Sequence, residues 1–344
     1  MGGRPNSRLI VAALVLTGTS AIGVSEARPG FQAGIVADVE RFRVYVMTPE
    51  ETVAAIDLRS GSTVWERELA ALPLALHRGV LVAQRDAADE RNFGLVLLDA
   101  ADGSLRGESV AKLPEAVRVA IRESISSRFR ATAYSRGAGL IVEWEHVALH
   151  KTYGAKDAGK PGATVSSGAL ELDVRTGAVV ELGAVPPVEE PQPYSIEPLP
   201  GDPPGRKVLR RRNASTGAEL APVRIEEKGI DLRLPSSDGR HFLASGKPQS
   251  APESLTRWTW VVLDVHTGRE AGRVGVAVPA APFVIVGGSI LVELPEHGFR
   301  EGERWVDEPR QLRAIELSTG EERWRRAVLE PDYRGAVPPG ALRR

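Results

Sequence analysis

One short phrase recurs six times along the chain, and it constrains the fold more than any other feature of the sequence. In each copy an acidic or amide residue is followed four positions later by glycine. In most copies the acidic or amide residue ends an apolar segment. The six pairs are Asp57 and Gly61, Asp99 and Gly103, Asp173 and Gly177, Asn213 and Gly217, Asp264 and Gly268, and Glu316 and Gly320. Such side chains accept hydrogen bonds from the next backbone amides, and glycine adopts the positive φ that reverses the chain. The phrase therefore predicts six equivalent tight turns between antiparallel strands.

A second kind of turn alternates with the first. Leu74 to Val82 reads as two short strands around Arg78-Gly79, and Phe283 to Val292 as two strands around Gly287-Gly288. Two-residue turns of this kind are typical of β-hairpins. Each repeat is therefore predicted to contain four short strands. Successive turn acids are 42, 74, 40, 51 and 52 residues apart, which is the spacing of propeller blades with insertions.

These units predict an all-β fold, a single β-propeller of four-stranded antiparallel blades. A lone sheet cannot bury both of its faces, whereas blades packed around an axis can. We count six blades, and seven stay open because the 74-residue interval could hide a degenerate one. The chain is expected to begin in mid-blade, with Arg43 to Val46 leading into the first turn, so that the two termini complete one blade together.

The N-terminal segment has the pattern of a secretory signal peptide over residues 1–27. Arg4 and Arg8 precede an apolar run, and the small-x-small triplet Ser25-Glu26-Ala27 follows it. The same run kept as a membrane anchor is the alternative. Residues 28–344 are then expected to form the propeller domain of an exported protein, periplasmic or extracellular.

Two segments of that domain are expected to depart from the repeat. Residues 111–129 are predicted to be a helical insert, because Val117, Ile121 and Ile125 lie four apart on one helical face. Residues 183–206 contain eight prolines and are predicted to be an extended loop between blades.

Charge and missing residue types exclude several functions. The chain has 44 Lys and Arg against 45 Asp and Glu, so it lacks the basic excess that nucleic acids and anionic membranes attract. The absence of cysteine removes disulfides, thiol catalysis, thiolate zinc sites and a lipid anchor on cysteine. We expect no nucleic-acid partner and no stable membrane span after signal cleavage. A closed ring has no free edge, so a monomer is expected.

No catalytic or metal-binding motif stands out in the sequence. His146 and His150 lie four apart, but four residues of a strand span about 13 Å, too far for one ion. There is no Gly-x-Ser-x-Gly elbow, phosphate loop or EF-hand loop. The basic clusters Arg210 to Arg212 and Arg323 to Arg326 are expected on solvated strand faces. We therefore predict no catalytic residue, no metal site and no cofactor, with binding residues in loops that the sequence does not identify.

The two end repeats resemble the PQQ-like, or quinoprotein-type, β-propeller repeat. Both place a tryptophan, Trp65 or Trp324, four residues after the turn glycine. In that family this tryptophan docks between neighbouring blades. The four central repeats have Gly107, Glu181, Ala221 and Gly272 at the same position. The chain thus looks like a divergent member.

The resemblance implies two kinds of function. The family contains quinone-dependent dehydrogenases and non-catalytic scaffolds, among them a lipoprotein of outer-membrane assembly. Many of the dehydrogenases place a vicinal disulfide against the quinone, and the lipoprotein needs a lipidated cysteine; neither feature can exist in a chain without cysteine. The sequence favours an exported, non-catalytic propeller that binds a protein or an envelope ligand. The alternative is a periplasmic PQQ-dependent oxidoreductase or another propeller enzyme.

Overall fold

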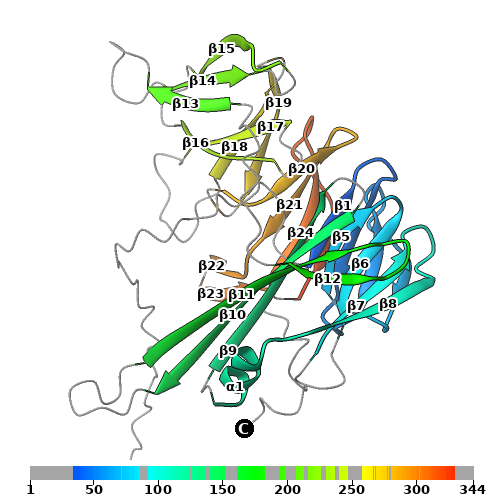
Figure 1. Cartoon of the computed structure of the whole chain (residues 1–344). Coiled ribbons are helices and arrows are strands. Elements are labelled where there is room, and N and C mark those ends of the chain that lie inside the picture. Colours follow the sequence, from blue (N-terminus) through cyan, green and yellow to red (C-terminus); the bar gives the residue numbers. More distant parts are fainter. Residues whose placement is uncertain are drawn as a thin grey trace, which may run out of the picture.

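Short antiparallel strands make up nearly all of the regular structure (Figure 1). The computed structural model describes residues 34–70, 72–85, 92–123, 126–136, 139–151, 161–182, 194–198, 207–212, 216–225, 230–236, 240–246, 258–265, 267, 269–276, 278, 280–301 and 303–329. The predicted signal peptide at residues 1–27 lies outside these residues. In the described part of the chain, no helix has the length and hydropathy to span a bilayer.

The strands form six consecutive sheets, which we call blades 1 to 6. Blade 1 contains β1 (Ile35–Asp38), β2 (Arg43–Met47), β3 (Val53–Asp57) and β4 (Thr63–Arg67). Blade 2 contains β5 (Leu72–His77), β6 (Val80–Arg85), β7 (Asn92–Asp99) and β8 (Leu105–Lys112). Blade 3 contains β9 (Ser126–Arg136), β10 (Gly139–Lys151), β11 (Pro161–Leu172) and β12 (Val179–Leu182).

The second half of the chain continues the same pattern. Blade 4 contains β13 (Tyr194–Pro198), β14 (Lys207–Arg212) and β15 (Glu219–Ile225), three strands within the described residues. Blade 5 contains β16 (Ile230–Pro235), β17 (His241–Gly246), β18 (Trp258–Asp264) and β19 (Glu270–Val276). Blade 6 contains β20 (Phe283–Val286), β21 (Ser289–Leu294), β24 (Gln311–Glu316) and β25 (Glu322–Ala327). A separate hairpin, β22 (His297–Glu301) and β23 (Arg304–Glu308), is inserted between β21 and β24.

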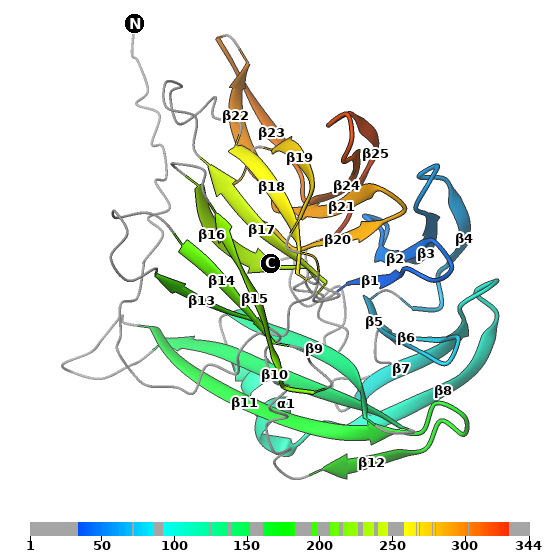
Figure 2. The same ribbon diagram turned by 90° about the horizontal axis from the view of Figure 1, so that it is seen from above.

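Seen from above, the blades follow one another in chain order around a common centre (Figure 2). In blades 1 to 3 the first strand lies innermost, since β1 contacts β5 and β5 contacts β9. The last strand lies at the rim, where β4, β8 and β25 are mostly exposed. This arrangement is the predicted β-propeller.

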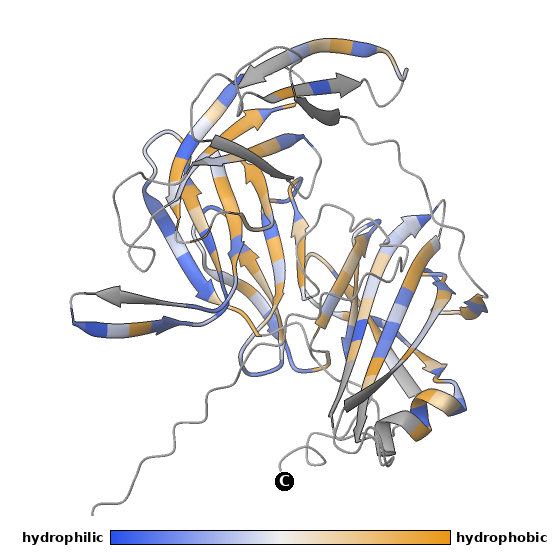
Figure 3. Ribbon diagram, turned by 90° about the vertical axis from the view of Figure 1, so that its left-hand side faces the viewer, coloured by the Kyte–Doolittle hydropathy of each residue, from blue (hydrophilic) through white to orange (hydrophobic). Residues whose placement is uncertain are grey.

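The core lies between the blades. Figure 3 shows hydrophobic residues concentrated along the middle strands of the sheets. Four buried clusters join blade 1 to blade 2, blade 2 to blade 3, blade 5 to blade 6, and blade 6 back to blade 1. Each cluster takes side chains from both neighbours, as a strand that is apolar on both faces requires. Packing between neighbours is therefore what holds the blades together.

The expectation that the chain begins in mid-blade is wrong. β1 precedes β2 and pairs with it from Ile35↔Val46 to Asp38↔Arg43, so blade 1 is built from one continuous segment. Blade 6 is likewise complete within residues 283–327. β1 was not predicted because its four residues are too few to display a periodic pattern. Blades 1 and 6 therefore meet through side-chain packing and isolated hydrogen bonds rather than through a shared sheet.

The 74-residue interval between Asp99 and Asp173 holds no additional blade among the described residues. It contains β8, the helix α1 (Glu115–Glu123) and the three long strands β9, β10 and β11. The helix is shorter than the expected insert at 111–129. At its N-terminal end the amide of Val117 donates to the carbonyl of Pro114. Beyond its C-terminal end the chain enters β9, in which Phe129 is buried. The long blade-3 strands account for the interval, and the described blades number six.

The proline-rich segment at 183–206 is also more than a loop. Residues 194–198 form β13, which pairs antiparallel with β14 from Tyr194↔Arg211 to Pro198↔Lys207. β13 lies at the edge of its sheet, where proline is tolerated because one side of the strand makes no ladder hydrogen bonds. The rest of 183–206 lies outside the described residues.

Candidate functional site

The acid-to-glycine turns gather on one face of the ring, which we call the turn face. In four blades the first turn is tied to the acid turn by one backbone hydrogen bond. The four bonds run from Leu58 N to Phe42 O at 2.9 Å, from Ala100 N to Gly79 O at 3.0 Å, from Val265 N to Arg240 O at 2.9 Å, and from Leu317 N to Gly288 O at 3.0 Å. In these blades the first turn and the acid turn therefore form one rigid corner on the turn face.

The Asp57 turn shows how each corner is built. The Oδ1 atom of Asp57 accepts hydrogen bonds from the amides of Arg59 at 3.0 Å and Ser60 at 2.8 Å, and from the Ser60 hydroxyl at 2.9 Å. The amide of Gly61, at φ +70°, donates to the Asp57 carbonyl at 2.8 Å. Hydrogen bonds from these amides, first that of Ser60, hold the pKa of Asp57 below its ordinary value.

Other copies of the turn repeat this chemistry with variations. The Oδ1 atoms of Asp99, Asp173 and Asp264 accept a backbone amide from Ala101, Arg175 and Thr267, respectively. These backbone hydrogen bonds lower the pKa of Asp99 and Asp173. Glu316 instead accepts from the Ser318 hydroxyl at 3.2 Å and pairs with Arg323. Gly103, Gly177, Gly217 and Gly320 have φ between +66° and +75°. Asn213 and Gly268 lie outside the described residues.

The two repeat tryptophans lie on the turns of the following blades. Trp65 of blade 1 lies against Gly103 of blade 2, and its Nε1 donates to the Ala100 carbonyl at 3.3 Å. Trp324 of blade 6 lies against Gly61 of blade 1, and its Nε1 donates to the Leu58 carbonyl at 3.0 Å. A side chain at either glycine would collide with the ring, with Cβ contacts of 2.7 and 2.5 Å.

A second inter-blade contact was missed in the sequence analysis. Arg67 and Arg326 each follow a repeat tryptophan by two residues, and their Nε atoms donate at 3.0 Å to the carbonyls of Gly103 and Gly61. At the corresponding position of blade 2, the Ser109 hydroxyl donates to the carbonyl of Gly177 at 2.5 Å. The signal was the Trp-x-Arg spacing common to both end repeats. Arg326 is exposed, as predicted for its cluster, yet it is bound to the neighbouring blade.

Tyr45 also belongs to the seam between blades 1 and 2. Its side chain is fully buried, and its hydroxyl donates to the Ala100 carbonyl at 3.0 Å, the same oxygen that accepts from Trp65 and Arg43. Burial, with the nearby Asp38 carboxylate as a lesser cause, raises the pKa of Tyr45 to about 12.

We expect a matching pH dependence of stability. A phenol whose pKa is higher in the folded chain than the ordinary value of about 10 keeps its proton in the folded chain and loses it in the unfolded chain between those values. The free energy of unfolding should therefore fall as pH rises from about 10 to about 12. Tyr45→Phe should remove this component, so the difference in unfolding free energy between wild type and variant, measured by urea titration, should shrink over that range. A difference that is independent of pH would contradict the expectation.

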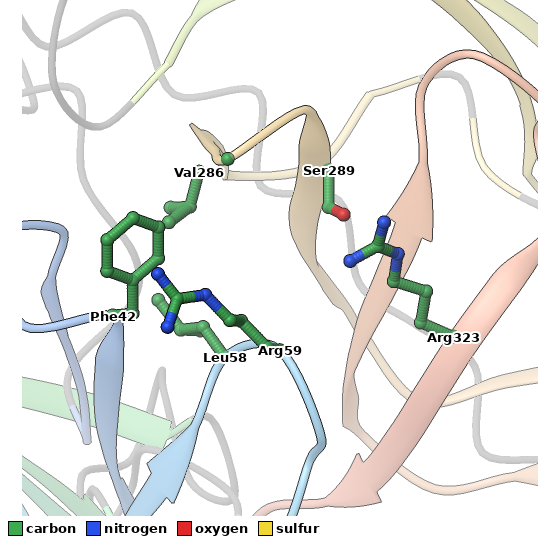
Figure 4. A pocket seen from close by; sticks show the side chains of 7 residues that line it. Phe42, Leu58, Arg59, Val286, Ser289 and Arg323 are labelled. Carbon is green, nitrogen blue, oxygen red and sulfur yellow. The ribbon is translucent and has the colours of Figure 1, made fainter.

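A small hollow opens on the turn face at the seam between blades 6 and 1 (Figure 4). It measures about 70 Å³ and is lined by Phe42, Leu58, Arg59, Val286, Gly287, Ser289 and Arg323. Ligand pockets for cofactor-sized molecules measure about 300–1,000 Å³. This hollow therefore admits only a small group, and we refer to it as the seam hollow.

The histidines singled out in the sequence both lie on β10. His146 is buried, and His150 stands four residues further along the same strand. Within the residues that the structure describes, no three ligand-type side chains gather into a group that could hold a metal ion.

The first part of the chain matches a known family. The family model described as outer membrane protein assembly factor BamB matches residues 16–148, which contain the last part of the signal-like segment, blades 1 and 2 and part of blade 3. No curated protein matches the sequence.

Among solved structures, the chain is similar to BamB from Moraxella catarrhalis, with 16% identity and a TM-score of 0.30 over 76% of this chain and 81% of that one. A quinohemoprotein alcohol dehydrogenase, ADHIIG from Pseudomonas putida HK5, has 13% identity and a TM-score of 0.25, covering 83% of this chain and 57% of that one. The dihydro-heme d1 dehydrogenase NirN in complex with DHE has 16% identity and a TM-score of 0.31, covering 87% and 66%. The chain thus spans less than two thirds of these two dehydrogenases.

The family match and the internal architecture agree. The match covers the first two repeats, and the same acid turn and blade order continue beyond it to residue 327. Strands, turns and inter-blade tryptophans all fit one repeat. Residues 16–148 match the family of PQQ-like propeller repeats, and the β-propeller built on the same repeat continues to residue 327.

Proposed function

We propose that this protein is an exported, non-catalytic propeller that acts as a binding or scaffold module in the cell envelope. The observation that carries the proposal is the match of residues 16–148 to the family of an outer-membrane assembly factor. The signal-like pattern at residues 1–27 supports export, to the periplasm or the exterior. A closed ring, expected to be monomeric, offers loops on both faces to a partner protein or an envelope ligand.

The inserted hairpin β22–β23 supports a role in protein binding. Trp305 on β23 is 56% exposed, and its ring packs over Gly298, with its Nε1 donating to Asp307 at 2.6 Å. An exposed tryptophan held in one orientation loses little conformational entropy on binding, and tryptophan is enriched among residues that dominate interface energies. Trp305 is thus suited to anchor a partner.

Ion pairs fasten this hairpin to blade 6. Glu308 on β23 accepts a hydrogen bond from Gln311 at 2.8 Å and pairs with Arg313 and with Arg325. His297 at the start of β22 lies 3.3 Å from the same carboxylate. The hairpin is therefore held to the blade at its base and projects its tip.

The test is site-specific photo-crosslinking in the source cell. A photoreactive aromatic residue at position 305 should capture one defined envelope protein, and Trp305→Ala should weaken binding of that purified partner by about tenfold or more. The matched control places the same residue at Leu105, which is 47% exposed on the rim strand β8. Equal capture at both positions, or no specific product, would contradict the proposal.

Titration with PQQ and Ca²⁺ separates the scaffold from the alternative oxidoreductase. We expect no change in absorbance and no rise in melting temperature, whereas any ligand that binds the folded chain must raise it. The chain cannot form the disulfide that many quinone enzymes use, because it has no cysteine. A saturable rise in melting temperature with PQQ would favour the enzyme.

A further inference from the structure

We propose that the seam hollow binds one small oxyanion group, a carboxylate or a phosphate-type group. The hollow of about 70 Å³ has the volume of roughly two water molecules in the liquid, so it has room for one such group. Anion binding here is independent of the scaffold role proposed above, and either can fail without the other.

Arg59 supplies the first positive charge. Its guanidinium carbon lies over the Phe42 ring, 3.9 Å from the ring centroid. Stacking uses the face of a guanidinium and leaves its N–H groups, which lie in the plane, free to donate. Within the part of the chain that the structure describes, no carboxylate forms an ion pair with the Arg59 side chain.

Arg323 supplies the second positive charge from β25, on the blade 6 side. It pairs with Glu316, the acid of the blade 6 turn. A guanidinium carries five N–H donors, and one carboxylate engages at most two of them in a bidentate pair. Donors therefore remain for a ligand. The Oδ1 atom of the nearby Asp57 accepts hydrogen bonds from the amides of its own turn.

Ser289 gives an independent observation that points to a ligand. It is 5% exposed, it lines the hollow, and its hydroxyl has no hydrogen-bond partner among the described residues. In Figure 4 the hydroxyl points toward the side on which Arg323 lies. A buried hydroxyl without a partner is unfavourable, and an oxyanion in the hollow would accept a hydrogen bond from it. The hollow thus offers two guanidinium groups and one hydroxyl to a single acceptor.

Blade 2 provides a matched corner that lacks the site. Asp99 and Arg106 form the same acid–arginine pair, with the same seven-residue spacing as Glu316 and Arg323. At the position equivalent to Ser289, however, blade 2 has Val80, because Val80 pairs with Asp99 as Ser289 pairs with Glu316. Arg106→Gln therefore removes a similar ion pair without touching the seam hollow.

The experiment measures the melting temperature of the purified full chain, and the Nε–H signals of its arginines by NMR, in titrations with inorganic phosphate or acetate. Sodium chloride at equal ionic strength serves as the reference. We expect a saturable rise in melting temperature with at least one anion and shifts of the Arg59 and Arg323 signals. Phosphate alone would identify a phosphate-type ligand, and acetate alone a carboxylate.

Three variants test the assignment. Arg59→Gln and Arg323→Gln should each weaken binding by about tenfold or more, as expected for the loss of a charge-assisted hydrogen bond. Ser289→Ala should weaken binding without lowering the melting temperature of the anion-free chain, because it deletes an unsatisfied hydroxyl. Arg106→Gln should bind like wild type. Absence of a response to both anions, or equal loss in Arg59→Gln and Arg106→Gln, would overturn the proposal.

Discussion

Arg310→Ala should lower the free energy of unfolding by about 3–5 kcal/mol, because it leaves a buried carboxylate without its partner. The Arg310 and Glu293 side chains are each 2% exposed, and the Nε and Nη2 atoms of Arg310 lie 2.9 and 2.7 Å from Glu293 Oε1. Arg310 also donates to the carbonyl of Leu329. Urea unfolding followed by circular dichroism measures the change.

The same arginine connects the end of the chain to the first blade. The Arg310 carbonyl accepts from the amide of Val328 at 3.0 Å, and the amide of Leu329 donates to the carbonyl of Met47 in blade 1 at 3.1 Å. Val328 belongs to the buried cluster between blades 6 and 1. We therefore expect Arg310→Ala to increase hydrogen exchange at the Leu329 amide more than at amides in blade 3.

Two controls separate the effect of burial from the effect of charge. Arg273→Ala breaks a surface pair in which Arg273 is 46% and Glu270 39% exposed, and it should change stability by less than about 1 kcal/mol. The double variant with Glu293→Leu and Arg310→Leu removes both buried charges and should recover much of the loss. Strictly additive losses in the double variant would show that the buried charge is not the cause.

Gly103→Ala should lower the free energy of unfolding by about 2–6 kcal/mol. A non-glycine residue in the left-handed region at φ +72° adds backbone strain of about 1–3 kcal/mol. The new methyl group would also lie 2.7 Å from two atoms of the Trp65 ring, and overpacking of this kind costs about 1–3 kcal/mol. The expected loss is the sum of the two effects.

Gly320 offers a control that isolates the tryptophan contact. Its φ of +74° is nearly the same, but the nearest atom to a new Cβ, the Arg273 carbonyl oxygen, lies 3.8 Å away. Gly320→Ala should therefore show the backbone strain alone. The difference between the two variants, measured by urea unfolding, is the contribution of blade docking. If both variants lose equal stability, Trp65 does not press against the turn of blade 2.

The pattern of the repeat could be predicted because its causes are local. The hydrogen bonds from the amides of residues 59 and 60 to Asp57, and the positive φ of Gly61, involve five consecutive residues. The same reasoning located the acid turns of blades 2, 3 and 6. The strand β1 was not predicted, because four residues show too little periodicity. Its place in blade 1 depends on its pairing with β2.

The inter-blade contacts and the seam hollow could not be predicted, since they join residues far apart in sequence. Arg326 reaches the Gly61 carbonyl across 265 residues, and Ser289, Arg59 and Arg323 meet only when blade 6 returns to blade 1. A lone serine or arginine carries no signal of such a meeting. For this reason Arg323, Arg325 and Arg326 were predicted only to lie on a solvated strand face.

The sequence by itself determined the all-β repeat and its acid turns, because strand alternation and turn hydrogen bonding act over a few residues, while the docking of Trp65 and Trp324 was implied by the family resemblance. Only the tertiary structure decided that each of blades 1 and 6 is complete within one segment of the chain, so that the two meet by packing, and that two guanidinium groups and an unsatisfied hydroxyl share one hollow. These features depend on which distant segments become neighbours, and that choice is made by burying the faces of whole sheets against each other.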